Sequence, residues 1–383
     1  MGLPLRELPP IGSIGRYHVL GRLATGGMAE IFLARDEGPR AAWRPLVIKR
    51  VLPHVAADRE YVESFVHEAT LSMRLRHPNI CSVYEFGEDG GTYYLAMEYV
   101  EGVSLRQLVR EASPLPFPIA ARVVADVAAA LAYAHTATDD QGRPLGLVHR
   151  DVTPENVLIG FDGRVKLLDF GIAKAHTQTQ KTQAGILKGK TAYMSPEQYR
   201  GEPIDGRADI FSLGVCLFEA LTGANPFDRG TEANTVAAIL FDETTPCPRE
   251  WRDDVPEALD AACRAALAKD VARRTPDGDK LARQLESWLR KHGDVRPGDL
   301  AAFLERRFGD RKAAGPTLDR TPLEAHVTDP LSSAALVAEL DDMVGETARA
   351  QQRKQRLIVL LAVLLILGAT GLIAWRLLSA PPP

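Results

Sequence analysis

Three polar residues in the middle of the chain have the types and order that transfer of a phosphoryl group requires. Asp151 follows His149 and Arg150, Asn156 comes next, and Asp169 opens an Asp-Phe-Gly tripeptide. This chemistry needs one carboxylate to orient the attacking hydroxyl and accept its proton, and an amide and a second carboxylate to hold Mg²⁺. Asp151 fits the first role, and Asn156 and Asp169 fit the second. A lone Asp in a loop is often only a turn or cap residue, so the prediction depends on the combination.

Two kinds of pattern surround these residues. From Tyr17 to Val100, short apolar runs separated by Gly and Asp predict strands, with one helix between them. The apolar face of that helix is formed at helical spacing by Val62, Phe65, Val66, Ala69 and Met73. Residues 120–135 and 209–223 are rich in Ala and Leu and predict long helices. Between them, two apolar runs joined by Phe-Asp-Gly-Arg predict a hairpin. The fold class is therefore α+β, a small β-rich unit followed by a larger helical one.

Together these features resemble the bacterial eukaryotic-like (Hanks-type) serine/threonine protein kinases over about three quarters of the chain, residues 17–290. The segments GGMAEIFLA, HRDVTPENVLI and YMSPEQ carry the bacterial likeness. The resemblance implies a two-lobed protein kinase fold, with a small β-rich N-lobe at 17–100 and a large helical C-lobe at 101–292. It also implies ATP and Mg²⁺ or Mn²⁺ as cofactors and protein Ser or Thr hydroxyls as acceptors.

The resemblance assigns further residues to the site. Lys49 corresponds to the strand lysine that contacts the α- and β-phosphates, and Glu68 corresponds to its ion-pair partner. Asn156 and Asp169 are the implied metal ligands, and Met97 occupies the gatekeeper position beside adenine. The implied ATP site is lined by Leu23, Ala24, Thr25, Gly26, Gly27, Met28, Ala29, Glu30, Ile31, Val47, Lys49, Met97, Glu98, Val100 and Leu158.

Other landmarks point to a protein substrate and to regulation. Ser195-Pro196-Glu197 resembles the motif that closes the activation segment, Asp209 the aspartate of the large buried helix, and Arg274 the partner of Glu197. Arg150 corresponds to the arginine that pairs with a phosphate on that segment. We expect autophosphorylation at one or more of Thr177, Thr179 and Thr182, although each could simply be a solvated loop residue.

The chain departs from the family pattern at three places. The glycine-rich loop reads ATGGMAEI, with Ala24 and Ala29 where glycines are expected, and an alanine methyl limits close approach of the backbone to phosphate. Thr153 stands where these kinases have a lysine, and Lys190 stands where they have a threonine. We hypothesise that the two residues have exchanged places, so that the Lys190 ammonium returns to the catalytic site. The alternative is that Lys190 is a solvated loop charge.

Composition limits the remaining possibilities. Lys and Arg total 46 against 50 Asp and Glu, a formal net charge of -4, so no nucleic-acid partner is expected. The four cysteines are far apart, which fits neither a disulfide scaffold nor a zinc site.

Residues 357–375 carry no charge and are long enough, at about 28 Å as a helix, to cross a bilayer. A buried core helix is the alternative.

The basic residues before this span outnumber those after it, which predicts a single-pass protein of the cytoplasmic (inner) membrane with its kinase domain in the cytoplasm. The predicted organisation is an N-terminal extension (1–16), the kinase domain (17–292), a possible docked helix (293–310), a juxtamembrane linker (311–352), the transmembrane helix (357–375) and a short tail (376–383).

Two rival functions remain open. A membrane-anchored pseudokinase scaffold is favoured by Ala24, Ala29 and Thr153, and opposed by Lys49 and the three polar residues described first. A small-molecule phosphotransferase of related fold is opposed by the long activation segment that ends at Glu197. Transient homodimerisation is expected if phosphorylation occurs between two copies.

Overall fold

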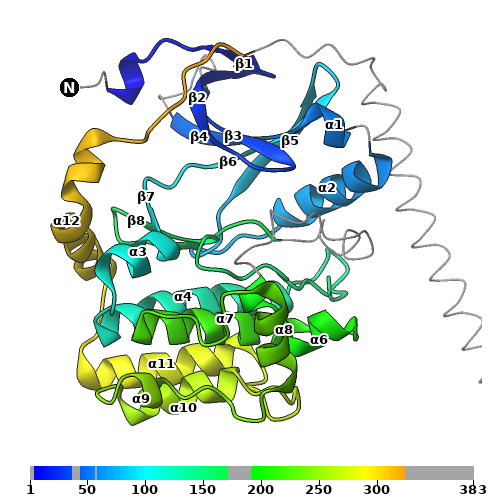
Figure 1. The fold of residues 1–383 in the computed structure, drawn as a ribbon. Helices are drawn as coiled ribbons and strands as arrows, with labels where there is room; N and C mark the ends of the chain where they lie inside the picture. Colours follow the sequence, from blue (N-terminus) through cyan, green and yellow to red (C-terminus); the bar gives the residue numbers. More distant parts are fainter. Residues whose placement is uncertain (1–3, 37–43, 57, 171–190, 324–383) are drawn as a thin grey trace, which may run out of the picture. The chain divides into compact units, whose positions relative to one another are not determined.

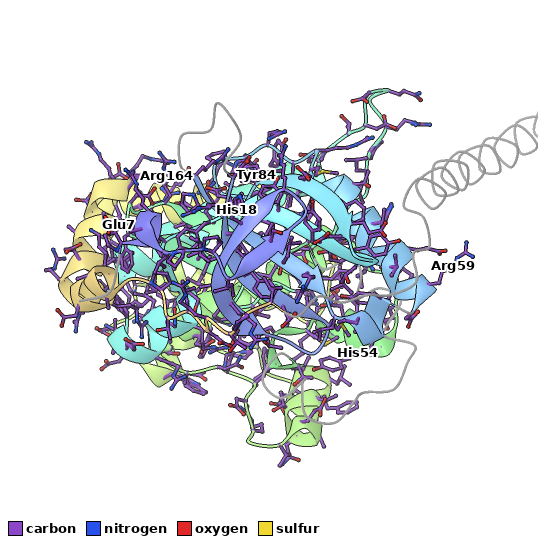
Figure 2. All side chains as sticks on the ribbon, turned by 90° about the horizontal axis from the view of Figure 1, so that it is seen from above. Glu7, His18, His54, Arg59, Tyr84 and Arg164 are labelled. Carbon is purple, nitrogen blue, oxygen red and sulfur yellow. The ribbon has the colours of Figure 1, made fainter. Side chains whose placement is uncertain are left out.

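The computed structural model describes residues 4–36, 44–56, 58–170 and 191–323. A twisted sheet, the N-lobe, lies above a larger body of helices, the C-lobe (Figure 1). Seen from above, His54 and Arg59 of the first two helices lie at one edge of the molecule and Glu7 lies toward the opposite edge (Figure 2). The predicted membrane span at 357–375 lies outside the described residues.

The N-lobe sheet has six antiparallel strands in the order β1-β2-β3-β4-β6-β5. Its elements are η1 (Leu5–Glu7), β1 (Gly12–Ile14), β2 (Tyr17–Thr25), β3 (Ala29–Asp36), β4 (Arg44–Val51), α1 (Pro53–Ala56), α2 (Arg59–Ser72), β5 (Val83–Asp89) and β6 (Thr92–Glu98). Strand β4 shows the alternation of a half-buried strand: Leu46 and Ile48 are buried, whereas Val47 and Lys49, which alternate with them, are less so.

Helix α2 is the helix predicted from the apolar spacing. Val62, Phe65 and Ala69 are buried, and Phe65 packs on Phe86 of β5 with ring centroids 6.2 Å apart. The helix ends at Ser72, before the His-Pro-Asn stop predicted from the sequence. This packing fixes the rotation of α2, and Glu68 lines the space between the lobes.

The C-lobe contains a small three-stranded sheet and a larger set of helices, two of which come between the first and second strands of that sheet in the chain. Its elements are β7 (Gly102–Ser104), α3 (Leu105–Ala112), α4 (Phe117–His135), β8 (Val157–Gly160), β9 (Val165–Leu167), η2 (Thr191–Tyr193), α6 (Pro196–Arg200), α7 (Gly206–Thr222), α8 (Glu232–Phe241), α9 (Pro248–Trp251), α10 (Glu257–Ala266), α11 (Gly278–His292) and α12 (Pro297–Ala314). The predicted hairpin is β8–β9, with Gly163 at φ 81° in its turn.

Helix α7 is the centre of this lobe. Every residue from Ala208 to Leu221 is buried, so the helix is packed on all faces, and the two carboxylates in this range, Asp209 and Glu219, both have hydrogen-bond partners. The Asp205 side chain caps its N-terminus by accepting from the Arg207 amide, and Gly223 at φ 87° ends it. Helix α4, the one described helix with the length and hydropathy of a membrane span, lies mostly buried in the core.

Both ends of the described chain differ from the predicted organisation. Part of the predicted extension, 1–16, is strand β1 of the N-lobe sheet. Helix α12 runs to Ala314, past the predicted end of the docked helix at residue 310, and residues 315–323 pack on the N-lobe instead of forming a free linker. The sequence missed this packing because the partner residues are about 300 positions away in the chain.

A buried ion pair ties α6 to the rest of the C-lobe. The Arg274 guanidinium donates to both carboxylate oxygens of Glu197 at 2.5 and 3.0 Å, and the two side chains are 0% and 5% exposed. Arg274 also donates to the Arg207 carbonyl at the start of α7. Although burial opposes the charged form, these hydrogen bonds lower the pKa of Glu197.

Arg274→Met should therefore lower the free energy of unfolding by about 3–5 kcal/mol, because it leaves the Glu197 carboxylate buried without its charge partner. Urea unfolding followed by circular dichroism measures this value. The neighbouring Arg273 is 85% exposed, so Arg273→Met is the matched control and should change stability by less than about 0.5 kcal/mol. Equal losses in the two variants would contradict the structural role of the pair.

Candidate active site

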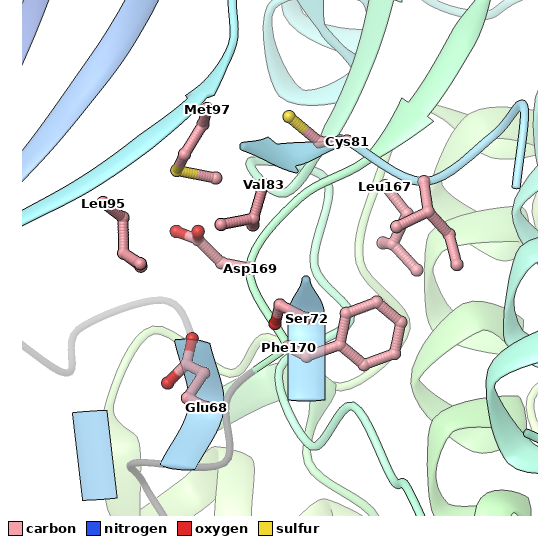
Figure 3. A pocket seen from close by; sticks show the side chains of 10 residues that line it. Glu68, Ser72, Cys81, Val83, Leu95, Met97, Leu167, Asp169 and Phe170 are labelled. Carbon is pink, nitrogen blue, oxygen red and sulfur yellow. The ribbon is translucent and has the colours of Figure 1, made fainter. Parts of the chain in front are cut away.

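The residues predicted to carry the chemistry meet between the two lobes. Figure 3 shows the Asp169 carboxylate between Glu68 of α2 and the side chains of Leu95 and Met97, with the Phe170 ring turned toward the C-lobe. Asp169 has a positive φ of 45°, an uncommon conformation for a residue other than glycine. Such strain persists only where the surroundings hold it in place.

The Asp209 carboxylate of α7 holds the loop that carries Asp151. One of its oxygens accepts from the His149 amide at 2.7 Å and the other accepts from the Arg150 amide at 2.8 Å. Arg150 has a φ of 65°, and His135 also contacts Asp209, with Nε2 at 2.8 Å. Since Asp209 is 1% exposed, this loop is fixed from inside the C-lobe.

His149 is a neutral structural residue in this arrangement. Its Nδ1 accepts from the Asp151 amide at 3.3 Å, so its Nε2 carries the proton and donates to the Leu168 carbonyl at 2.7 Å. Its ring packs against Phe170 with centroids 4.7 Å apart. Complete burial lowers the pKa of His149, outweighing the nearby Asp209 charge. The general base must therefore be another residue.

Asp151 and Asn156 are directly connected. The Asn156 amide nitrogen donates to the Asp151 carboxylate at 2.9 Å and to the Asp151 carbonyl at 2.7 Å. The Asn156 carbonyl accepts from the Leu168 amide at 2.8 Å, which links this loop to the strand before Asp169. These bonds use both amide protons of Asn156 and leave its Oδ1 as the atom that can bind a cation.

The donor set suits Mg²⁺. An amide oxygen and a carboxylate are hard oxygen ligands, and Mg²⁺ is usually held by one or two carboxylates together with substrate phosphates and water. Within the described ranges there is no cluster of three or more His, Cys, Asp or Glu residues that could form an all-protein metal site. Asn156 and Asp169 therefore fit a metal that arrives with a nucleotide.

Lys49 lies opposite Asp169, with Nζ 3.1 Å from the Asp169 carboxylate. Burial of the ammonium group opposes its charge, but the carboxylates of Asp169 and Glu68 outweigh this and raise the pKa of Lys49. The carboxylate in ion-pair contact with Lys49 is that of Asp169. The predicted partner Glu68 contributes a nearby negative charge that also raises the pKa of Lys49. Lys49 stays charged at any physiological pH.

The predicted nucleotide-binding residues lie on β2, β3, β4 and β6 of the N-lobe sheet, in the turn between β2 and β3, after β6 and on β8. Residues 23–31 form the end of β2, a turn and the start of β3, and the Gly26 amide donates to the Ala29 carbonyl at 2.9 Å. Val47 and Lys49 are on β4, Met97 and Glu98 end β6, Val100 follows, and Leu158 is on β8.

Two predicted nucleotide contacts have other roles for their side chains. The Glu30 carboxylate accepts from Arg22 at 2.8 Å and from Arg50 at 2.7 Å, so both of its oxygens are engaged by arginines. The Glu98 carboxylate accepts from Lys166 of β9 at 2.8 Å and from the Ser82 amide at 3.1 Å. Sequence spacing could not reveal these partners, which lie 8 to 68 residues away in the chain.

The loop that carries Asp151 is also held by a hydrogen-bond network centred on Arg106, which the sequence analysis missed. Arg106 of α3 donates to Glu155 at 2.8 Å, to the Tyr193 hydroxyl at 2.5 Å and to Glu219 of α7, and Tyr193 also donates to Glu219. The Arg106 amide donates to the Pro154 carbonyl at 3.0 Å. Burial of Glu219 raises the pKa of its carboxyl group.

Several predicted residues cannot be placed. Lys190, Thr177, Thr179 and Thr182 lie outside the described residues. Thr153, the proposed counterpart of Lys190, is 1% exposed, and its hydroxyl has no hydrogen-bond partner among the residues that the structure describes.

The fold and this site define a protein kinase, and the chain belongs to the protein kinase domain family, whose profile matches residues 17–285. The expected two-lobed kinase fold is thereby confirmed. The crystal structure of the PknI kinase domain of Mycobacterium tuberculosis matches with a TM-score of 0.55 at 29% identity, covering 75% of this chain and 99% of that one.

Curated relatives extend the similarity. Tyrosine-protein kinase MasK of Myxococcus xanthus is 42% identical over 347 residues, 88% of this chain and 53% of MasK. Serine/threonine-protein kinase PrkC of Bacillus subtilis is 36% identical over 273 residues, 71% of this chain and 40% of PrkC. Serine/threonine-protein kinase PknL of Mycobacterium tuberculosis is 32% identical over 383 residues, 94% of this chain and 92% of PknL. The chain thus spans about half of MasK and less of PrkC.

The neutral His149 makes stability depend on pH. The pKa of His149 is lower in the folded protein than in the unfolded chain. As pH falls below about 6.5, the unfolded chain therefore takes up the proton first, and the free energy of unfolding decreases. His149→Gln keeps a donor and an acceptor but cannot titrate in this range. We expect the stability difference between wild type and His149→Gln to shrink by up to about 1.4 kcal/mol between pH 7.5 and 5.5.

Urea unfolding at the two pH values measures this difference. His77 and the carboxylates titrate in both proteins and cancel in the comparison. A difference that stays constant with pH would show that folding leaves the pKa of His149 unchanged, and one that grows as pH falls would show that folding raises it.

Proposed function

We propose that this chain is a membrane-anchored serine/threonine protein kinase that transfers the γ-phosphoryl group of ATP to protein hydroxyls, including its own. The observation that carries the proposal is the convergence of Lys49, Asp151, Asn156 and Asp169 on one cleft, from two lobes and three separate segments: β4, the loop before β8 and the segment after β9. ATP with Mg²⁺ or Mn²⁺ would supply the phosphoryl group and its charge neutralisation.

Each residue has a distinct role in this mechanism. Asp151 orients the acceptor hydroxyl and takes its proton, a role that the buried, neutral His149 cannot fill. Lys49 supplies a permanent positive charge for the phosphates, and Asn156 and Asp169 supply oxygen ligands for the metal. The backbone amides of the β2–β3 turn cover the phosphates, with Gly26 and Gly27 offsetting the alanines at positions 24 and 29.

A protein acceptor is favoured over a small molecule. Helix α6, which starts directly after Ser195, is held by the Glu197–Arg274 pair, and the Gln198 side chain donates to the Arg150 carbonyl at 3.3 Å. This element links the end of the activation segment to the catalytic loop. The buried Nε of Arg150 has no hydrogen-bond partner among the described residues, which supports a role in binding a phosphate on that segment.

Two acceptor classes have support. PrkC and PknL bear the name of serine/threonine kinases, and we adopt that specificity. Tyrosine specificity is the second candidate, because MasK, with 42% identity, is named a tyrosine kinase. Position 153 carries Thr where serine/threonine kinases of this family have a lysine, so the choice between the two acceptor classes is tested by experiment.

Autophosphorylation of the full chain with radiolabelled ATP and Mg²⁺ or Mn²⁺ tests the proposal. Wild type should be labelled, and Asp151→Asn should lower the rate by at least about 10³-fold, because the general base is lost. The exposed Asp140→Asn is the matched control and should match wild type. Mass spectrometry should place the phosphate on Ser or Thr, with Thr177, Thr179 and Thr182 as the first sites to inspect.

Three outcomes decide between the alternatives. Phosphotyrosine alone would replace the serine/threonine assignment with the second candidate. ATP binding without label in wild type would support the pseudokinase scaffold. Lys190→Ala belongs in the same assay: loss of label supports the exchange with Thr153, and unchanged label contradicts it.

The membrane part of the proposal rests on residues 357–375, which carry no charge. The full chain expressed in bacteria should sediment with membranes and resist alkaline carbonate extraction. A variant lacking 357–375 should be found in the soluble fraction, with kinase activity retained. Recovery of the intact chain in the soluble fraction would contradict membrane anchoring.

A further inference from the structure

The nine residues that follow α12 connect the C-lobe to the nucleotide-binding hairpin of the N-lobe. We call residues 315–323 the C-terminal strap. Helix α12 belongs to the C-lobe, where its residues Leu300, Phe303, Leu304 and Phe308 are part of the main apolar core. From the end of α12 the strap, orange in Figure 1, rises to β1 and β2. It therefore touches the strand that leads into the Gly26–Gly27 turn.

Backbone hydrogen bonds join the strap to the sheet. Asp319 forms an antiparallel bridge with Arg22 of β2, with N···O distances of 2.8 and 2.9 Å. The Leu323 amide donates to the Ile11 carbonyl at 3.3 Å, and Arg320 donates to the Pro9 carbonyl at 2.6 Å. The strap is thus held at several points along its length.

Side chains make the contact specific. Leu318 lies directly over Gly21, where a Cβ would approach the Leu318 Cβ to 2.8 Å. Leu323 lies over Gly12, where a Cβ would come within 3.0 Å of the Leu323 Cβ. Leu323 also packs against the apolar cluster of the N-lobe that contains Ile14. Two glycines on adjacent strands therefore make room for two leucines of the strap.

A chain of ion pairs leads from the strap to β4, the strand that carries Lys49. The Asp319 carboxylate pairs with the Arg22 guanidinium, Arg22 also pairs with Glu30 at 2.8 Å, and Glu30 pairs with Arg50 at 2.7 Å. Arg22 and Glu30 lie on the two strands that flank the glycine turn. Arg50 is the residue after Lys49 on β4. The strap therefore contacts the base of the hairpin that must close over the phosphates.

We propose that the C-terminal strap is part of the nucleotide-binding apparatus, with Leu318, Asp319 and Leu323 as positioning residues that hold β2 so that the Gly26–Gly27 turn lies over the phosphates of ATP. The proposal rests on the proposed use of ATP. The docked strap raises nucleotide affinity, and its release lowers it, without any contact between the strap and the nucleotide.

Equilibrium binding of a non-hydrolysable ATP analogue with Mg²⁺ to the full chain in detergent tests this. Leu318→Asp with Leu323→Asp should release the strap and raise the Kd by about tenfold, within the usual range of coupling between two sites. Asp319→Asn should raise it by about threefold, as expected for an exposed ion pair. Initial-rate kinetics should show a matching rise in KM for ATP with kcat changed by less than about twofold.

Asp270→Asn is the matched control. Asp270 pairs with an exposed arginine, Arg273, and accepts from the amide two residues later, as Asp319 does with Thr321. It lies in the C-lobe away from the strap and should leave the Kd unchanged. If the double leucine variant does not fold, Asp319→Asn and Arg22→Gln decide the question alone: their effects on Kd should be less than additive, because both remove the same pair.

Additive effects, or a Kd equal to that of wild type in Asp319→Asn and the leucine variant, would overturn the proposal. Because binding is measured without turnover, a chain that binds the analogue in a strap-dependent manner but transfers no phosphate would refute only the proposed kinase activity.

Discussion

The buried carboxylate of Asp209 is the contact on which the site depends. It accepts from two consecutive backbone amides, and those amides can both point at one carboxylate only because Arg150 adopts a positive φ. That conformation turns the chain so that His149 faces inward and Asp151 faces the cleft. A buried carboxylate needs such hydrogen bonds to be tolerated, and the strained loop needs the carboxylate to persist, so each stabilises the other.

Electrostatics then join the two lobes at the reacting centre. Lys49 comes from the sheet, Asp169 from the loop after β9 and Glu68 from a helix, and their charges keep the lysine protonated despite its burial. The Glu98–Lys166 pair makes a second connection between the lobes, from the end of β6 to β9. Because both pairs cross the cleft, the separation of the lobes is coupled to the geometry of the site.

Local patterns predicted much of this arrangement. The apolar spacing of α2, the Asp-Gly turn of β8–β9 and the spacing of Asp151, Asn156 and Asp169 are short-range features, and the structure brings these three polar residues to one cleft. Contacts distant in sequence were not predictable. Neither the pairing of Asp319 with Arg22 nor that of Glu30 with Arg50 leaves a pattern in the sequence, and the Arg106–Tyr193–Glu219 cluster joins three separate helical segments. The composition of the predicted linker gives no information about its partner. Its docking on the N-lobe could therefore not be predicted from the sequence.

The docked strap changes what kind of motion the two lobes can make. A body joined to another at a single flexible point can turn about any axis through that point. The N-lobe is joined to the C-lobe by the covalent chain at residues 99–101 after β6, and a second time by residues 315–323, which continue from α12 and bind β1 and β2 through non-covalent contacts. Two attachments leave only rotation about the line that joins them. While the strap is in place, opening and closing of the cleft about that line is therefore favoured over twisting of the sheet across the helices, and the Lys49–Asp169 distance changes with it.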